Sequence, residues 1–272
     1  YRQRGVPVIL GGMHVALLPE EAAQHADSIF VGDAETGWAQ VIADARQGRL
    51  RPRYDAPAGV AQMGGVVPRR DLFAGKGYLP ISLMQFSRGC RFACNFCAVS
   101  QYFGKRHYLR RIDEVVNEIT AQDRHFLFFV DDNIASDRAA LKELCHALIP
   151  LKVHWISQAS LDVTRDAELM RLMERSGCWG HVMGFESITP ESLRSARKSP
   201  NLGKHANYAR EVAVLREHGL QTWAAFTLGY DHDTPESIAA TVDFALQHRF
   251  TFAAYNILMP YPGTPLYREL AA

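Results

Sequence analysis

The stretch ISLMQFSRGCRFACNFC, residues 81–97, joins a strand-like segment to three closely spaced cysteines. Its first part, residues 81–86, is short and mostly apolar, which favours a β-strand. Cys90, Cys94 and Cys97 follow within eight positions. The number of cysteines in the chain is odd, so a disulfide framework is not expected. The three clustered cysteines are therefore the ones that indicate a functional site.

From residue 81 onward, segments that favour strands alternate with segments that favour helices. The predicted strands are residues 81–86, 126–130, 153–157, 181–185, 222–227 and 252–256. The predicted helices are residues 112–124, 138–149, 167–176, 208–218, 235–248 and 265–270. Six βα units in sequence order are typical of an α/β fold, here a parallel partial barrel of the TIM type spanning residues 81–272.

The cysteine loop follows the first predicted strand, and functional groups of parallel barrels lie at the C-terminal ends of strands. Three thiolates on one short loop can converge on a soft metal centre and leave a coordination position free. A structural zinc site with His107 as the fourth ligand is the alternative. Cys145 and Cys178 stand alone in apolar segments and are expected to be buried.

Residues 1–48 predict a smaller, Rossmann-like α/β unit. Its predicted elements are strands at residues 8–10 and 28–31 and helices at residues 19–25 and 38–47. Two strands cannot form a doubly wound sheet, so we expect further strands upstream and interpret the sequence as a fragment. Residues 49–80 are rich in Gly, Pro, Arg and Ala, and are predicted to be an interdomain linker.

The charges are balanced, with 30 Lys and Arg against 29 Asp and Glu, which gives a net charge of +1. Such a chain has no global field to attract nucleic acid or an anionic membrane, so nucleic acid is not an expected partner. The apolar run at residues 126–130 is far shorter than the roughly 20 residues of a membrane span. Without a leader sequence, a soluble cytoplasmic protein is expected.

The spacing CxxxCxxC after the first barrel strand resembles the radical S-adenosylmethionine superfamily. Further segments resemble the subgroup whose barrel follows a cobalamin-binding domain: SRGC at 87–90, FVDDN at 129–133, GFES at 184–187, FTLG at 226–229 and PYPGTP at 260–265. The resemblance implies that Cys90, Cys94 and Cys97 hold a 4Fe-4S cluster. It also implies that S-adenosyl-L-methionine chelates the fourth iron.

The N-terminal unit resembles the end of that cobalamin-binding domain. Gly11 and Gly12 match its last glycine turn and are candidate cobalamin-binding residues, and residues 32–35, GDAE, match its closing acidic loop. Two departures stand out. The sequence lacks the Asp-x-His-x-x-Gly segment that can ligate cobalt, and the superfamily's Gly-Gly-Glu segment is replaced by residues 131–133.

The resemblance also suggests residues that contact S-adenosyl-L-methionine. Phe96 would pack near the adenine, or else serve as a loop anchor. Asp131, Asp132 and Asn133 would bind the amino group or the ribose, or else cap the helix that begins near residue 138. Ser157 would reach the methionine carboxylate.

Three further candidates lie at the ends of later strands. Gln158 is expected to bind the methionine carboxylate together with the preceding serine. Glu186 would accept hydrogen bonds from two ribose hydroxyls, or else pair with a nearby Lys or Arg. Gly229 would let the backbone approach the adenine, or else simply form a turn.

The resemblance implies reductive cleavage of the cofactor to a 5'-deoxyadenosyl radical, with a flavodoxin or ferredoxin as external electron donor and a small molecule as substrate. Cobalamin-dependent methylation of an unactivated carbon is the favoured reaction. Ring formation or another rearrangement is an alternative. A tRNA methylthiotransferase is disfavoured because the sequence has no second cysteine triad. A non-catalytic iron–sulfur or zinc module is the hypothesis from a different class.

Overall fold

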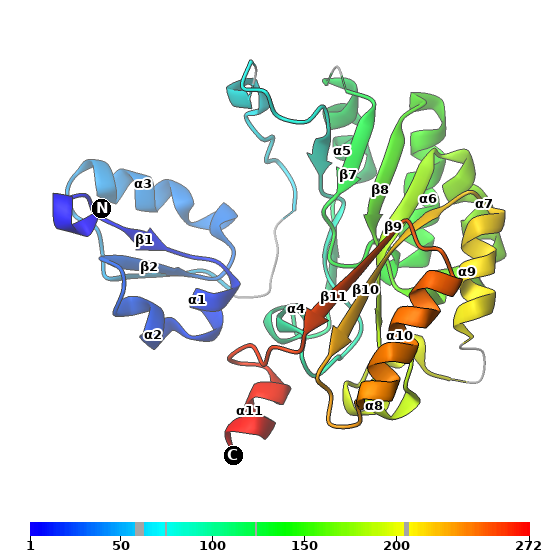
Figure 1. The fold of residues 1–272 in the computed structure, drawn as a ribbon. Helices are drawn as coiled ribbons and strands as arrows, with labels where there is room; N and C mark the ends of the chain where they lie inside the picture. The colour runs from blue at the N-terminus through cyan, green and yellow to red at the C-terminus, as the bar shows by residue number, and fades with distance from the viewer. Residues whose placement is uncertain (58–62, 74, 123, 204–206) are drawn as a thin grey trace.

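The computed structural model of the chain describes residues 1–57, 63–73, 75–122, 124–203 and 207–272. Within these residues the strands form a six-stranded, a three-stranded and a two-stranded sheet (Figure 1). The linker prediction at residues 58–62 and 74, and residue 123 of the helix predicted at 112–124, lie outside the described residues.

The six-stranded sheet forms the framework of the larger unit. Its neighbouring strands all pair in parallel and follow sequence order across the sheet. They are β4 (Ser82–Met84), β7 (Phe126–Phe129), β8 (His154–Gln158), β9 (Cys178–Glu186), β10 (Gln221–Leu228) and β11 (Phe252–Ile257). Each of the six predicted strands is present. Among the described residues β4 and β11 are the edges and do not pair, so the sheet is an open, partial barrel.

Helices cover one face of this sheet (Figure 1). They are α5 (Ile112–Thr120), α6 (Arg138–Leu148), α7 (Ala167–Arg175), α9 (Tyr208–Glu217) and α10 (Pro235–Gln247). Each begins and ends within a few residues of its predicted bounds. The core lies between the two layers, where Trp155 is fully buried against Phe129 at a ring-centroid distance of 5.7 Å. The indole nitrogen of Trp155 donates to the Ser176 carbonyl at 3.1 Å.

The N-terminal unit contains a parallel sheet with the order β1-β2-β3 in the described part of the chain. Its elements are β1 (Ile9–Leu10), α1 (Met13–Leu17), α2 (Pro19–Ala23), β2 (Ser28–Val31), α3 (Trp38–Arg46) and β3 (Arg53–Asp55). Four of them were predicted. The short helix α1 was not predicted, because the glycine turn before it resembled a loop.

The third strand corrects the prediction that the linker begins at residue 49. Strand β3 pairs with β2, so this part of the predicted linker belongs to the N-terminal sheet. Tyr54 is its only large apolar side chain, which left no periodic signal in the sequence. The structure buries that ring against Phe30 and Val41, and its hydroxyl donates to Asp44 at 2.9 Å.

Shorter elements complete the fold: β5 (Ser87–Gly89), α4 (Ala98–Tyr102), β6 (His107–Leu109), α8 (Pro190–Ser195) and α11 (Pro265–Ala271). Strands β5 and β6 form an antiparallel pair that was not predicted. No helix in the described ranges has the length and hydropathy needed to cross a membrane.

We expect Gly180→Ala to disrupt the central strands of the larger sheet. Gly180 has a φ of +148°, and a Cβ there would overlap the Gln221 carbonyl on the neighbouring strand. The expected loss in free energy of unfolding is about 3 kcal/mol or more, measured by urea denaturation. Gly219→Ala is the matched control, because Gly219 also has a positive φ but open space around it; its loss should stay near ~1 kcal/mol. Equal losses would contradict the packing role of Gly180.

Candidate functional site

The three cysteines lie on a loop between β5 and α4, beyond the C-terminal end of β4. Residues 107–109 flank this loop because β6 pairs with β5. The close approach of the two strands needs Gly89 at the end of β5, whose φ is +87° and whose Cβ would overlap the Arg106 carbonyl. This strand pair therefore fixes the entry to the cysteine loop, at the strand ends where the sequence predicted the site.

Asp131 holds the first part of this loop. It is fully buried, and its carboxylate accepts hydrogen bonds from the amide of Phe86 at 3.1 Å and from the amide and hydroxyl of Ser87. Burial raises the pKa of Asp131 to about 7, against the effect of these donors. The carboxylate thus binds Phe86 and Ser87 at the start of the cysteine loop, and a role of Asp131 toward the cofactor stays a prediction.

Asp132 and Asn133 continue the same pattern. The Asp132 carboxylate accepts from the Gly89 amide at 2.7 Å, and burial raises its pKa. Asn133 Nδ2 lies 3.6 Å from the sulfur of Cys90 and donates toward it. Three consecutive side chains after β7 thus bind three successive parts of the cysteine loop. Their role toward a cofactor stays a prediction.

The alternative that these residues cap the following helix is also corrected. The N-cap of α6 is Asp137, whose side chain accepts from the Ala140 amide at 3.0 Å. Asn133 instead caps the 3-10 helix Ile134–Ser136, where its Oδ1 accepts from the Ala135 amide.

Arg91, between the first two cysteines, ties the loop to the segment after β8. Its guanidinium donates to Asp162 at 2.7 Å and to the Ser136 carbonyl at 3.1 Å. Arg138 donates to the same Asp162 carboxylate at 2.6 Å. The sequence did not predict this network, because Arg91 and Asp162 lie far apart in the chain.

The second half of the loop is anchored from another direction. The amide of Asn95 donates to the Ala196 carbonyl, and the Leu266 amide on α11 donates to the Asn95 carbonyl, both at 3.1 Å. The hydroxyl of Ser100 donates to the Cys97 carbonyl at 3.1 Å. Phe96 is half-buried within this anchored segment.

Cys94 lies beside a buried ion pair. Lys198 Nζ is 2.7 Å from Glu186 Oε1, and the second oxygen of Glu186 accepts from the Thr227 hydroxyl at 2.9 Å. Burial raises the pKa of the Cys94 thiol to about 11, although the Lys198 charge acts in the opposite direction. Glu186 thus pairs with a lysine, which is the alternative role predicted for it. The sequence did not identify Lys198 as that lysine.

Glu186 occupies a strained and crowded position at the end of β9. Its φ is +62°, in the left-handed region that non-glycine residues rarely adopt. A Cβ at Gly184 would overlap its Oε1 and would lie 2.7 Å from Lys198 Nζ. Glycine at this position therefore makes room for the pair, and local strain of this kind often accompanies functional sites.

Of the remaining candidates, Ser157 is not at the mouth of the barrel. It is fully buried on the helix-covered face of β8, and its hydroxyl bonds to His181 Nδ1 at 2.8 Å. Since side chains alternate along a strand, Gln158 faces the opposite side and is half-buried. The Ser157 hydroxyl therefore has a partner within the protein, and its contact with a carboxylate of the cofactor stays a prediction.

Gly229 forms the turn that follows β10. Its φ is +104°, and its amide donates to Asp233 at 2.8 Å. These observations match the turn alternative, while an approach to the adenine stays a prediction.

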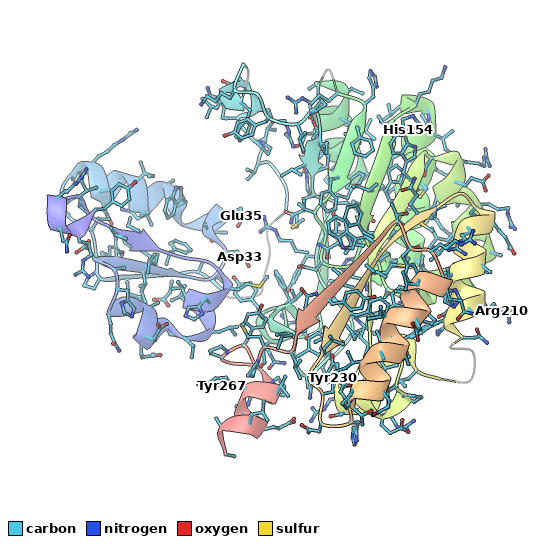
Figure 2. The ribbon with its side chains drawn as sticks, in the orientation of Figure 1. Asp33, Glu35, His154, Arg210, Tyr230 and Tyr267 are labelled. Carbon is cyan, nitrogen blue, oxygen red and sulfur yellow. The ribbon has the colours of Figure 1, made fainter. Side chains whose placement is uncertain are left out.

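The N-terminal unit docks beside the cysteine loop. Arg88 on β5 reaches Glu35 at 2.6 Å and Asp33 at 3.5 Å, and Figure 2 labels both acids between the two units. Burial raises the pKa of Asp33. Helix α1 packs against α4, the helix that directly follows the last cysteine.

The glycine turn lies at the start of α1. Gly12 has a φ of +98° and is exposed, and a Cβ at Gly11 would meet only Phe30 at 3.6 Å or more. The exposed turn therefore directly precedes α1, the helix of the N-terminal unit that packs against α4.

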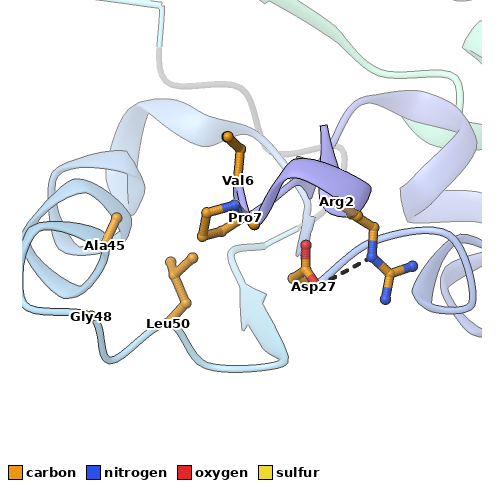
Figure 3. Close-up of a pocket in the computed structure, with 8 residues that line it drawn as sticks. Arg2, Val6, Pro7, Asp27, Ala45, Gly48 and Leu50 are labelled. Atoms are coloured by element: carbon orange, nitrogen blue, oxygen red, sulfur yellow. Dashed lines mark hydrogen bonds and ion pairs between the residues drawn. The ribbon is translucent and has the colours of Figure 1, made fainter.

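Two cavities lie outside the cysteine loop. One of about 230 Å³ lies between the units and includes Glu35, Arg88 and Arg110 in its wall. The other, of about 350 Å³, belongs to the N-terminal unit (Figure 3). It is lined by Arg2, Gly5, Val6, Pro7, Asp27, Ala45, Gly48 and Leu50. Its charged groups, Arg2 and Asp27, pair with each other at 3.2 Å, and its lining includes no predicted site residue.

The donor set of the loop fits an iron–sulfur cluster. Three thiols on one short loop, with the cationic Lys198 beside the buried Cys94, are the donors such clusters use. Across the described ranges, no three His, Cys, Asp or Glu side chains are grouped so as to hold a single metal ion.

The fold and the site define an α/β partial barrel with a three-cysteine loop at the C-terminal end of its first strand. A family model described as the radical SAM superfamily matches residues 84–245, more than half of the chain. The chain belongs to the radical SAM superfamily, which confirms the family predicted from the cysteine spacing.

Known relatives match the chain over nearly its whole length. The bacteriochlorophyllide d C-12(1)-methyltransferase of Chlorobaculum tepidum is 31% identical over 99% of the chain. The C-8(2)-methyltransferase of the same organism is 27% identical over 99%. The chain spans 61% and 63% of these two proteins, about three fifths of their length.

A solved structure shares the fold. TsrM from Kitasatospora setae, described as a radical S-adenosylmethionine methyltransferase, superposes with a TM-score of 0.76 at 19% identity. The match covers 98% of this chain and 58% of that one, which includes both the N-terminal unit and the partial barrel.

We expect Arg88→Ala to loosen the docking of the N-terminal unit. The change removes the ion pairs with Asp33 and Glu35, and a loss of about 1 kcal/mol corresponds to roughly fivefold faster amide exchange there. Hydrogen exchange at residues 33–36 and in α4 measures the effect. Arg53→Ala is the control, since Arg53 pairs with Asp55 within the N-terminal unit. Unchanged exchange in Arg88→Ala would contradict the docking role.

Proposed function

We propose that this chain is a radical S-adenosylmethionine enzyme that binds a 4Fe-4S cluster through Cys90, Cys94 and Cys97. It cleaves S-adenosyl-L-methionine reductively and uses cobalamin to methylate an unactivated carbon of a small molecule. The observation that carries the proposal is the loop itself: three thiols, held by side chains of neighbouring strands, at the functional end of a parallel barrel.

When bound, the cluster and S-adenosyl-L-methionine supply a 5'-deoxyadenosyl radical, and cobalamin supplies the methyl group. The chain's own residues bind and orient these groups. Lys198 offsets the negative charge of a cluster beside Cys94, and Glu186 at the strand end presents oxygens with lone pairs left to accept from ribose hydroxyls. Of the two candidates for the methionine carboxylate, Gln158 is the more exposed one. The reductant is a low-potential one-electron donor of the flavodoxin or ferredoxin type.

The cobalamin part of the proposal rests on the N-terminal unit and the relatives. We assign residues 1–57 to a cobalamin-binding domain of Rossmann-like topology and residues 81–272 to the barrel, with a linker between them. The exposed turn at Gly11 and Gly12 would contact the corrin. Two relatives named as methyltransferases support methyl transfer as the reaction.

The first test addresses the three cysteines. Anaerobically reconstituted protein should contain four iron and four sulfide per chain and, with a reductant, should form 5'-deoxyadenosine from S-adenosyl-L-methionine. Replacing any one of Cys90, Cys94 or Cys97 by Ala should abolish this product, because each thiolate is a ligand. Product analysis by mass spectrometry is the readout.

Cys145→Ala is the matched control, because Cys145 is a buried thiol in α6 that lies within the apolar core. It should keep the cluster and the product. A triple cysteine variant that still assembled the cluster and formed 5'-deoxyadenosine would refute the assignment. Ring formation in the substrate without a methyl gain would redirect the proposal to the cyclisation alternative.

A second test addresses Glu186. Glu186→Ala should weaken S-adenosyl-L-methionine binding by about 1–3 kcal/mol, roughly 5-fold to 150-fold, through lost charged hydrogen bonds. Anaerobic titration calorimetry measures the affinity, and iron analysis should show unchanged cluster content. Glu191→Ala, which removes an exposed carboxylate paired with Arg194, should bind like the parent. If Glu186→Ala bound S-adenosyl-L-methionine as tightly as the parent protein, the proposed contact with the ribose would be wrong. Glu186 would then serve only as the partner of Lys198.

A further inference from the structure

Asn133 makes a side-chain hydrogen bond to a sulfur of the cysteine triad. Its Nδ2 lies 3.6 Å from Cys90 Sγ and 3.1 Å from Ser160 Oγ. The side chain is buried, with 4% of its surface exposed. Solvent therefore does not compete strongly for this donor.

The orientation of the amide is fixed by its oxygen. Asn133 Oδ1 accepts from the amides of Ala135 and Ser160, each at 3.3 Å. Rotating the amide by 180° would point Nδ2 at these two donors and the oxygen at the sulfur. Since the backbone amides can only donate, the donor side must face Cys90.

The residues around Asn133 hold it in place. Ser160 Oγ donates to Asp162 Oδ1 at 2.5 Å. The other carboxylate oxygen of Asp162 accepts hydrogen bonds from Arg91 and Arg138. The amide is thus part of a network that spans the loops after β4, β7 and β8. Such support reduces the freedom of the side chain to turn away from the sulfur.

We propose that Asn133 is a positioning residue that raises the reduction potential of the cluster through an N–H···S hydrogen bond to the Cys90 thiolate. The inference rests on the proposed function, because it requires the cluster. Adding one electron increases the negative charge on the cluster and its thiolates. A donor aimed at one of those sulfurs therefore stabilises the reduced form more than the oxidised form.

The test compares two variants by EPR-monitored redox titration of the reconstituted chain without S-adenosyl-L-methionine. Asn133→Ala removes the donor, and the isosteric Asn133→Asp places a carboxylate oxygen toward the sulfur. Both should lower the potential, with Asn133→Asp lower still. We expect at least a tenfold shift in the reduction equilibrium for Asn133→Asp, which is about 59 mV for one electron.

Asn117→Ala is the matched control. It removes the side chain of an exposed asparagine on α5, outside the network around Asn133, so its potential should equal that of the parent. Parental potentials in both Asn133 variants at full iron and sulfide content would overturn the inference while leaving the proposed function intact. A parent chain without a 4Fe-4S signal would instead overturn the proposed function.

A second readout covers variants that fail to retain a cluster. Parent protein labelled with ¹⁵N at the side-chain amides of asparagine should show a ¹⁵N coupling to the reduced cluster in pulsed EPR. Asn95 in the cysteine loop also carries a side-chain amide, but its nitrogen donates to the Ser195 carbonyl at 3.0 Å. The absence of any ¹⁵N coupling would overturn the inference.

Discussion

The structure of the site depends on one set of hydrogen bonds, between the segment after β7 and the loop after β4. Asp131, Asp132 and Asn133 bind the loop in register with the sequence, from the Phe86 amide to the Cys90 sulfur. The eight-residue loop with three thiols, residues 90–97, has no regular structure of its own, and buried carboxylates and amides supply the partners that its backbone requires. The parallel pairing of β4 with β7 brings the two segments together, so the fold directly produces the geometry of the cysteines.

The same loop also joins the two units of the chain. Arg88, two residues before Cys90, pairs with the acidic loop of the N-terminal unit, and α4 after Cys97 packs against α1. The contacts that hold the cysteines and the contacts that dock the glycine turn are therefore contiguous. In the proposed function this arrangement brings a cobalamin held by the N-terminal unit close to the cluster, because both are fixed to residues 86–102.

Periodicity and spacing were enough to predict the parallel sheet, its helices and the position of the cysteines. They failed where a single side chain or a long-range partner decides the structure. Tyr54 alone anchors β3, so three residues with no apolar pattern were assigned to the linker. Ser157 is a polar residue near a strand end, as expected for a cofactor contact. Because side chains alternate along a strand, however, its hydroxyl lies on the helix-covered face of the sheet. Lys198 reaches Glu186 from an irregular segment, which no local pattern predicts.

The central claim is that the three thiolates leave one iron of a 4Fe-4S cluster without a protein ligand and that S-adenosyl-L-methionine occupies it. Mössbauer spectra of the ⁵⁷Fe-reconstituted chain, recorded with and without S-adenosyl-L-methionine, test this most directly. The account predicts that one iron of the four acquires a distinct, higher-coordinate signature when the cofactor is added. Four equivalent irons that do not respond to the cofactor, or a chain that retains zinc and no iron, would contradict it.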